Sequence, residues 1–217
     1  GLTQHMMKYL RDGNGFTFPS HLEYEVAEKL CYMLSEHVPG WQDEHLQVRW
    51  VTSGSNACNA AIRLARAASG KKVIISSEYH GSADQFVVLT EPHHGIPTMC
   101  GAFMEPFTWG DMSSLDKWNN HPDLAAIIFE QSIIDPEPGY YNALREFCDH
   151  NHCLLIADEV VTGLRYGLGG ASEMFGIIPD LVCMGKGLSA GNGLAALVGP
   201  KRLMDWFARV DPVFISS

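Results

Sequence analysis

Apolar residues along this chain of 217 residues fall into two alternating patterns. Apolar runs of about four to eight residues between turn residues are typical of strands buried in a sheet. Such runs predict strands at 47–52, 72–76, 85–89, 124–130, 153–160, 180–186 and 194–198. Apolar residues that recur about every three or four positions predict helices at 21–37, 56–68, 113–119, 140–150 and 201–209. Because strands alternate with helices, we expect an α/β fold with a mostly parallel sheet of about seven strands and helices on both faces.

Two of the predicted helices have a distinct apolar face. The helix at 56–68 has a stripe of small apolar residues, which indicates close packing on the sheet. Its members are Ala57, Ala60, Ala61, Leu64, Ala65 and Ala68. Arg63 and Arg66 fall outside this stripe, and Gly70 follows as a stop signal. In the helix at 21–37 the residues expected to be buried are Val26, Leu30, Met33 and Leu34.

Composition and charge narrow the classes of protein to which this chain can belong. Hydrophobic residues make up 46% of the chain and charged residues 18%. This low share of charged residues favours a surface that is buried against a partner. The formal net charge of −10 disfavours nucleic-acid binding, because phosphates need a basic patch. No apolar run approaches the length of a membrane span, so we expect no membrane partner. Six scattered cysteines without a Cys-x-x-Cys pair favour reduced thiols in a cytoplasmic protein.

Single charged residues close two of the predicted strands. Asp158 ends the run at 154–157, and Lys186 follows the run at 181–184. Open α/β sheets bind their ligands at the carboxyl ends of strands, so both residues are candidates for a site. A carboxylate at this position is costly to bury unless it is paired, and a helix cap or a salt bridge with Arg165 are the alternatives for Asp158.

Lys186 stands between two glycines, which give its side chain room. A partly desolvated lysine is a neutral amine and can form a Schiff base with an aldehyde. The alternative is an ordinary surface turn, which is the more common setting of a Gly-Lys-Gly sequence.

An anion site is predicted where the strand at 47–52 meets the following helix. Ser53, Gly54 and Ser55 lie at this junction, where free N–H groups and the helix dipole favour negative charge. The alternative is an ordinary N-cap, since serine is favoured there in any case. Tyr79 follows the strand at 72–76 and could stack on a planar cofactor, or could be a tyrosine at the edge of the core.

Two further motifs point to other chemistries and are set aside. Ser189 lies in a Gly-x-Ser-x-Gly sequence, which is typical of the nucleophile in α/β-hydrolases. That fold needs a catalytic histidine later in the chain, but the last histidine is His152. His93 and His94 have no further ligand at metal-binding spacing, so we interpret them as part of a solvated loop and predict no metal site.

The remaining groups suit pyridoxal 5′-phosphate (PLP): a lysine for its aldehyde, a carboxylate for its ring nitrogen and an anion cradle for its phosphate. The order and spacing of the motifs resemble the class III aminotransferases of PLP fold type I, nearest to the subgroup similar to glutamate-1-semialdehyde aminomutase. The resemblance covers nearly the whole chain. It begins at 16–19 and is strongest at 157–165, 168–171, 175–181 and 185–187.

The resemblance implies a role for each candidate residue that forms the centre of the site. Lys186 would carry the Schiff base and then move a proton between substrate and cofactor. Asp158 would bind the pyridine nitrogen, and Ser53, Gly54 and Ser55 would hold the phosphate.

The resemblance also implies the surroundings of the cofactor ring. Tyr79 would stack on one ring face and Val160 would pack on the other, with His80 nearby. Glu130 would lie close to the cofactor and the substrate. This chain departs from the family at Asn56, where an acidic residue is usual, and after Glu130, where proline is usual.

The function implied is transfer of an amino group from an amino donor to a carbonyl acceptor, by a homodimer with shared active sites. We expect an N-terminal helical segment at 1–45 and a PLP-binding large domain at 46–217, with the family's small C-terminal domain largely absent. A PLP-dependent aminomutase and a shortened, non-catalytic paralogue that acts as a binding subunit are the alternatives. The sequence does not identify a residue that binds a substrate carboxylate.

Overall fold

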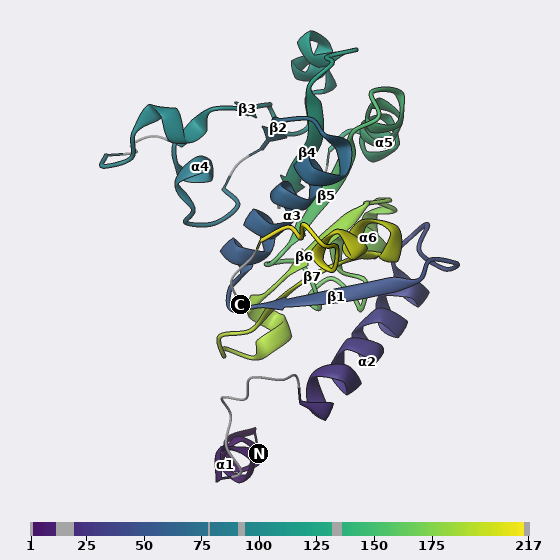
Figure 1. Ribbon diagram of the computed structural model, residues 1–217. Helices are drawn as coiled ribbons and strands as arrows, with labels where there is room; N and C mark the ends of the chain where they lie inside the picture. The colour runs from purple at the N-terminus through teal and green to yellow at the C-terminus, as the bar shows by residue number, and fades with distance from the viewer. Residues whose placement is uncertain (1, 12–19, 78, 91–93, 132–135, 215–217) are drawn as a thin grey trace.

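One seven-stranded sheet organises the residues that the computed structural model describes, which are 2–11, 20–77, 79–90, 94–131 and 136–214. Its strand order is β1-β7-β6-β5-β4-β2-β3 (Figure 1). The strands are β1 (Leu46–Val51), β2 (Val73–Ser76), β3 (Met104–Pro106), β4 (Leu124–Glu130), β5 (Leu154–Glu159), β6 (Leu181–Met184) and β7 (Ala195–Pro200). β7 runs antiparallel to β1 and β6, and all other pairs are parallel. The predicted α/β fold with a mostly parallel sheet is therefore confirmed.

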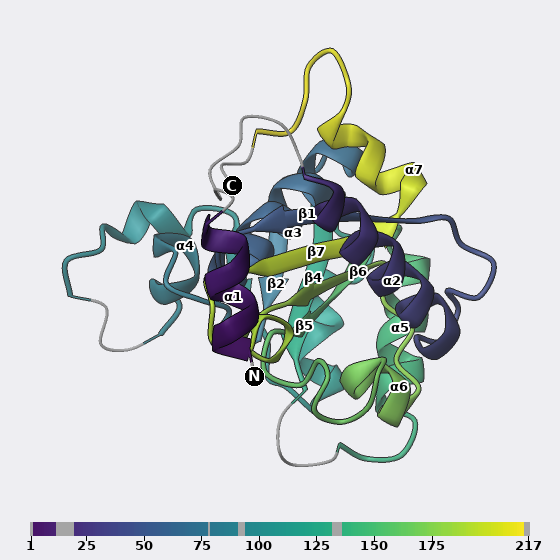
Figure 2. The same cartoon turned by 90° about the horizontal axis from the view of Figure 1, so that it is seen from below.

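Helices cover both faces of the sheet (Figure 2). The α-helices are α1 (Leu2–Arg11), α2 (His21–His37), α3 (Gly54–Ser69), α4 (Asp84–Val87), α5 (Tyr140–His150), α6 (Gly170–Phe175) and α7 (Lys201–Met204). The 3-10 helices are η1 (Thr98–Gly101), η2 (Met112–Trp118), η3 (Lys186–Ser189) and η4 (Asp205–Phe207). α2, α5 and α6 pack on one face, whereas α3, α4 and α7 pack on the other.

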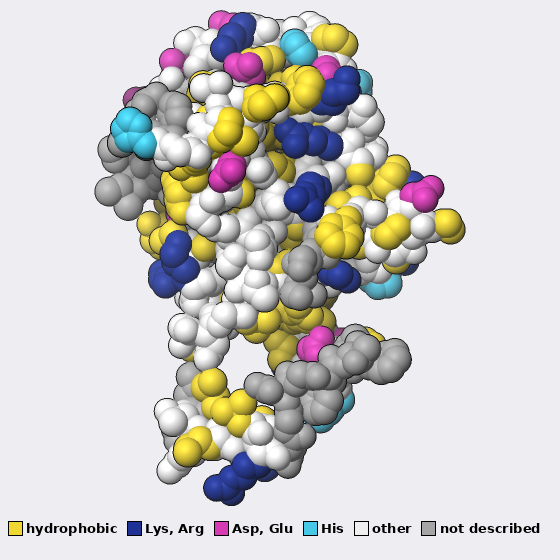
Figure 3. Space-filling view, turned by 60° about the vertical axis from the view of Figure 1, so that its left-hand side comes forward, with side chains coloured by type: hydrophobic (Ala, Val, Ile, Leu, Met, Phe, Trp, Pro, Cys, Tyr) yellow, Lys and Arg dark blue, Asp and Glu magenta, His cyan; other side chains and the backbone are white. Residues whose placement is uncertain are grey.

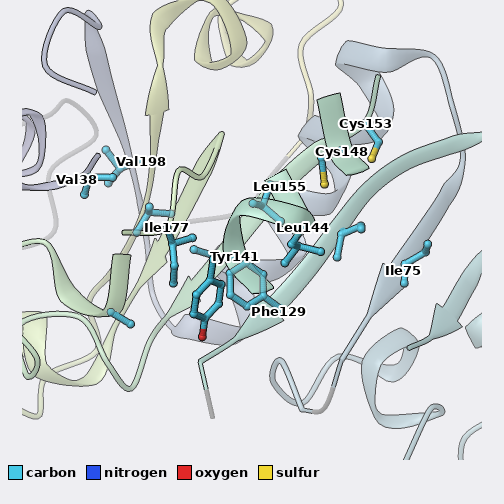
Figure 4. Close-up of a cluster of buried hydrophobic side chains, with 14 of the residues drawn as sticks. Val38, Ile75, Phe129, Tyr141, Leu144, Cys148, Cys153, Leu155, Ile177 and Val198 are labelled. Carbon is cyan, nitrogen blue, oxygen red and sulfur yellow. The ribbon is translucent and has the colours of Figure 1, made fainter. Parts of the chain in front are cut away.

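Side chains alternate along each central strand between two hydrophobic cores. In β5, Leu155 and Ala157 join the core under α2, α5 and α6, while Ile156 joins the core under α3. Figure 4 shows Phe129, Leu144 and Leu155 among the buried side chains of the first core. Because successive residues of a strand point to opposite faces, continuous apolar runs are required wherever both faces are covered.

α3 positions the candidate site and forms for local reasons. Ser53 is its N-cap, since its side chain accepts a hydrogen bond from the Asn56 N–H at 3.2 Å. Gly70 ends it in the left-handed conformation with φ of 70°. The predicted alanine stripe is buried, apart from the half-buried Ala68, so that α3 lies closely against β4, β6 and β7.

The strand predicted at 85–89 is wrong. Asp84–Val87 form the short helix α4, in which only Phe86 is buried. The place beside β2 that this strand would have taken is occupied by β3, where Ile74 pairs with Met104. A β-branched run therefore folded as a helix because another segment satisfied the edge of the sheet.

Two smaller predictions are also corrected, and a third is confirmed. The helix predicted at 201–209 is shorter, since α7 ends at Met204 and continues as the 3-10 helix η4. The short helix predicted at 113–119 is confirmed, and it is the 3-10 helix η2. Val26 was expected to be buried but is exposed, because α2 meets the core only from Leu30 onward.

α1 extends away from the body of the molecule and exposes several apolar side chains (Figure 3). These are Met6, Met7, Tyr9 and Leu10. The motif at 16–19, where the family resemblance begins, lies outside the described residues. None of the described helices combines the length and the apolar character that crossing a bilayer requires.

Candidate active site at the carboxyl ends of the strands

The sheet register brings three polar side chains into one row. Glu130 pairs with Asp158 across β4 and β5, and Asp158 pairs with Cys183 across β5 and β6. Paired residues of parallel strands point to the same face, which here is the face covered by α3. Glu130 therefore lies next to Asp158 along the sheet, and its closeness to the cofactor and the substrate stays a prediction.

Asp158 is 4% exposed and accepts three hydrogen bonds. Its Oδ2 accepts from His80 Nδ1 at 2.8 Å and from Cys58 Sγ at 3.4 Å. Its Oδ1 accepts from the Val160 N–H at 3.0 Å. The alternative of a salt bridge with Arg165 is wrong, because that guanidinium donates instead to the Val161 carbonyl at 2.5 Å.

Glu159, the neighbour of Asp158, faces the opposite side of the sheet and has a structural role. Its carboxylate accepts hydrogen bonds from the Ala171 N–H at 2.9 Å and the Ser172 N–H at 2.7 Å. The hydroxyls of Thr162 and Ser172 also donate to it. These donors belong largely to the first turn of α6, where a negative charge is favourable.

Val160 brings the first turn of α3 and the end of β6 together. A Cβ on Gly54 would lie 2.6 Å from both Cγ atoms of Val160, so this position admits only glycine without a shift. A Cβ on Gly185 would lie 3.3 Å from Val160 Cγ1 and 3.5 Å from Gly54 Cα. The residue before Lys186 is therefore in close contact with the start of α3.

The segment predicted to form an anion cradle is the start of α3, with small polar residues around it, and its binding of an anion stays a prediction. Ser55 Oγ accepts a hydrogen bond from the Ser82 N–H at 3.1 Å, and a Cβ on Gly81 would lie 2.4 Å from the same oxygen. Gly81 has a φ of 111°, a conformation that side chains rarely adopt. Ser53 also acts as the ordinary N-cap that was the alternative interpretation, while the N–H groups of Gly54 and Ser55 open the helix.

Lys186 begins η3 directly after β6, at the predicted edge of the sheet. Its φ of 35° lies in the left-handed region, which is costly for a residue with a side chain and is often found at functional sites. The expected partial burial of Lys186 is wrong for the single chain, where its side chain is exposed. The physical reason is that residues 186–194 form an outward turn, in which no residue is buried.

The two predicted neighbours of the cofactor ring differ strongly in exposure. Tyr79 is 55% exposed, whereas His80 is 1% exposed and packs edge-on against Phe86. His80 Nε2 has no hydrogen-bond partner within the described part of the chain. Since Nδ1 donates to Asp158, the tautomer with a bare Nε2 is the one that this contact favours.

Cys58 and Ser82 belong to this group of contacts but were not predicted from the sequence. Cys58 lies on the inner face of α3, one turn after Gly54, and a helical projection places it there. Its meeting with Asp158, one hundred residues later, depends on how α3 is placed over β5. Ser82 contacts Ser55 through its backbone N–H, a contact that has no sequence signal.

The other motifs do not join the site. Ser189 Oγ donates to the Asn192 carbonyl at 2.6 Å, so its hydroxyl is bound within its own turn. His93 lies outside the described residues, and His94 is exposed. No group of three or more metal-ligating side chains is found in the ranges that the structure covers.

The residues present fit PLP. Asp158 is a buried carboxylate without a lysine or arginine partner among the described residues, and a protonated ring nitrogen would supply the missing positive charge. The start of α3 offers N–H groups to a phosphate, and Gly54 lets backbone approach it closely. Lys186 provides an amine on the same edge of the sheet.

Comparison with known proteins agrees with this geometry. A model of the aminotransferase class-III family matches residues 13–211, and the chain therefore belongs to that family. Its structure is similar to a transaminase with PLP bound, with a TM-score of 0.85 and 25% sequence identity over 99% of this chain. It is also similar to an omega-transaminase from Sphaerobacter thermophilus, with a TM-score of 0.84 and 27% identity over 99% of this chain.

A third similar structure is the FumI protein of Sphingopyxis sp. MTA144, with a TM-score of 0.78 and 26% identity over 99% of this chain. The share of each solved protein that is covered is 53%, 53% and 50% in turn. The chain thus spans about half the length of these solved structures.

Proposed function

We propose that this chain is a PLP-dependent aminotransferase, which moves an amino group from a small-molecule amino donor to a carbonyl acceptor. The observation that carries the proposal is the buried, triply hydrogen-bonded Asp158, at a sheet edge that also carries Lys186 and the start of α3. Family membership over residues 13–211 supports it. When bound, PLP supplies an electron sink that makes a proton on the substrate's amine-bearing carbon removable.

In this proposal each residue of the chain has one task. Lys186 Nζ holds the aldehyde end of PLP and carries a proton to or from the substrate carbon. Asp158 would bind the ring nitrogen, while His80 and the Val160 N–H orient the carboxylate.

The remaining assignments concern phosphate and ring contacts. Ser53, Gly54 and Ser55 bind the phosphate through the first turn of α3. Val160 packs on one face of the ring and Tyr79 on the other. Glu130 approaches the substrate from the neighbouring strand, which its register with Asp158 supports.

We further propose a homodimer in which the partner subunit covers the edge of the sheet that carries Lys186. The low share of charged residues, 18%, and the exposure of Tyr79 support this arrangement. In our division of the chain, 1–45 form a helical segment and 46–217 the PLP-binding large domain. Six free thiols support a reducing compartment, and we place the protein in the cytoplasm.

Within the family we place the chain nearest the glutamate-1-semialdehyde aminomutase-like subgroup, on the resemblance of 157–165 and 168–171. An aminomutase would return the amino group to its own substrate. Turnover without an external amino donor would assign that reaction. A binding subunit without catalysis would show no turnover with any donor, although the chain retains Lys186 and Asp158.

The experiment is a screen of amino donors and carbonyl acceptors with added PLP, in which the new amino product is detected by mass spectrometry. Lys186→Ala should lower the rate by at least a hundredfold, the low end of about 10²–10⁴ for a positioned proton-transfer group. Lys201→Ala is the matched control, because Lys201 is an exposed lysine on α7 that pairs with Asp205. Equal rates for the two variants would refute the assignment of Lys186.

A further inference from the structure

Cys58 is a contact of Asp158 that the proposed function does not use. It lies on α3 with 0% exposure, and its Sγ is 3.4 Å from Asp158 Oδ2. His80 Nδ1 approaches the same oxygen at 2.8 Å, while the other carboxylate oxygen accepts from Val160. The thiol thus comes from α3, the element that also forms the anion cradle.

The surroundings of Cys58 keep it in the form that donates a hydrogen bond. A hydrogen bond with Cys183, burial and the negative charge of Asp158 all raise the pKa of the Cys58 thiol well above its ordinary value of 9.0. It therefore stays protonated across the physiological range. Burial likewise raises the pKa of the Cys183 thiol, which stands next to Asp158 in the register of β5 and β6.

The direction of the bond follows from these protonation states. An ionised carboxylate only accepts hydrogen bonds, so the Cys58 S–H donates to Asp158 Oδ2. A thiol is a weak donor, but a charged acceptor and a dry environment strengthen the contact. With donors on both oxygens, the carboxylate has one favoured rotation about its Cβ–Cγ bond.

We infer that Cys58 is a positioning residue, whose thiol fixes the orientation of the Asp158 carboxylate and thereby couples α3 to the nitrogen end of the bound PLP. This inference rests on the proposed function, because the orientation of Asp158 matters only when a ring nitrogen faces it. Cys58 touches Asp158 rather than the cofactor in this arrangement. Its effect is therefore expected on cofactor affinity.

The test compares the PLP dissociation constants of the wild-type chain, Cys58→Ala and Cys58→Ser, measured by titration of the absorbance of bound PLP. Alanine and serine leave similar space behind, and only serine retains a donor. Cys58→Ala should weaken PLP binding about threefold to tenfold, as expected for the loss of one hydrogen bond. Cys58→Ser should bind within about twofold of the wild type, because its hydroxyl replaces the thiol.

Cys148→Ala is the matched control for removal of a buried thiol. Cys148 is also 0% exposed, but it lies in the other core, on α5 (Figure 4). The PLP affinity of the Cys148→Ala variant should equal that of the wild type. If Cys58→Ala does not fold, Cys58→Val replaces it in the series, since valine retains bulk without a donor.

Three results separate the possible outcomes. A wild-type chain that does not bind PLP overturns the proposed function, and this inference with it. A wild-type chain that binds PLP while Cys58→Ala binds equally well overturns the inference alone. Equal losses in Cys58→Ala and Cys58→Ser also overturn it, because they would show that the thiol acts through packing.

Discussion

The contact between Gly54 and Val160 gives the sharpest prediction about how the site is built. In Gly54→Ala the new Cβ would lie 2.6 Å from both Cγ atoms of Val160. Rotation of the β-branched side chain can turn its single hydrogen toward only one of the two contact points, so a methyl still meets the new Cβ and the clash is not fully relieved. Overpacking of this kind costs about 1–3 kcal/mol, which alanine's higher helix propensity offsets only in part.

Chemical denaturation monitored by tryptophan fluorescence measures this cost, and thermal unfolding provides a second measure. For a chain of this size a loss of 1–3 kcal/mol corresponds to a melting temperature lower by roughly 3–9 °C. Gly193→Ala is the control, because a Cβ there would lie 3.7 Å from the Thr52 carbonyl oxygen, an ordinary contact. Its effect should stay within about 0.5 kcal/mol.

A double-mutant cycle tests the cause. Val160→Ala removes both methyls and should relieve the clash, so Gly54→Ala should cost less in that background. The coupling free energy should be about 1 kcal/mol or more, as for residues in direct contact. Additive effects of the two substitutions would show that Val160 does not restrict position 54, and would refute the packing argument for this glycine.

Three further predictions follow from the same contacts. Asp158→Asn should lower PLP affinity and turnover. Glu159→Gln should instead lower the free energy of unfolding by about 2–3 kcal/mol, measured by denaturation, and leave PLP affinity unchanged. The reverse pattern would contradict a cofactor role for Asp158 and a structural role for Glu159. Hydrogen bonds from the Gly169 N–H and His37 lower the pKa of Glu173 from its ordinary value of 4.5. The ionised Glu173 side chain therefore stabilises the fold above pH 4.5, and this stabilisation is lost as the pH falls through the lowered pKa. The stability difference between wild type and Glu173→Gln should therefore shrink below about pH 4.5, and a difference independent of pH would contradict this. Burial raises the pKa of the Cys31 thiol to about 11, so its alkylation at pH 8, followed by mass spectrometry, should be slow in the native chain and fast in denaturant; equal rates would contradict the burial.

The parts of the fold that the sequence predicted are those with local signals. α3 is an example, because an N-cap serine, a stripe of alanines and a terminal glycine all lie within its own residues. The central strands were predicted because burial on both faces demands continuous apolar runs. The prediction of a strand at 85–89 was wrong because β3 takes the place beside β2. β3 is short and lies far from β2 in the sequence, so its pairing could not be predicted.

In the candidate site, too, only the residues with a local sequence signal could be predicted. Asp158 and Lys186 stand at strand ends, which the sequence marks with a charge after an apolar run. The partners of Asp158 were not predictable, since His80 and Cys58 reach it from segments 78 and 100 residues away. The exposure of Lys186 depends on the direction in which the turn at 186–194 leaves the sheet. The glycines on either side of Lys186 do not predict this direction.

The central claim is that Lys186 is the residue to which PLP attaches. Incubation of the chain with PLP, reduction with borohydride and peptide mapping by mass spectrometry test this claim without any substrate. We predict a stable phosphopyridoxyl group on Lys186, reduced labelling in Asp158→Asn and no labelling of residue 186 in Lys186→Ala. A label spread over exposed lysines such as Lys29 and Lys201, with none on Lys186, would contradict the account.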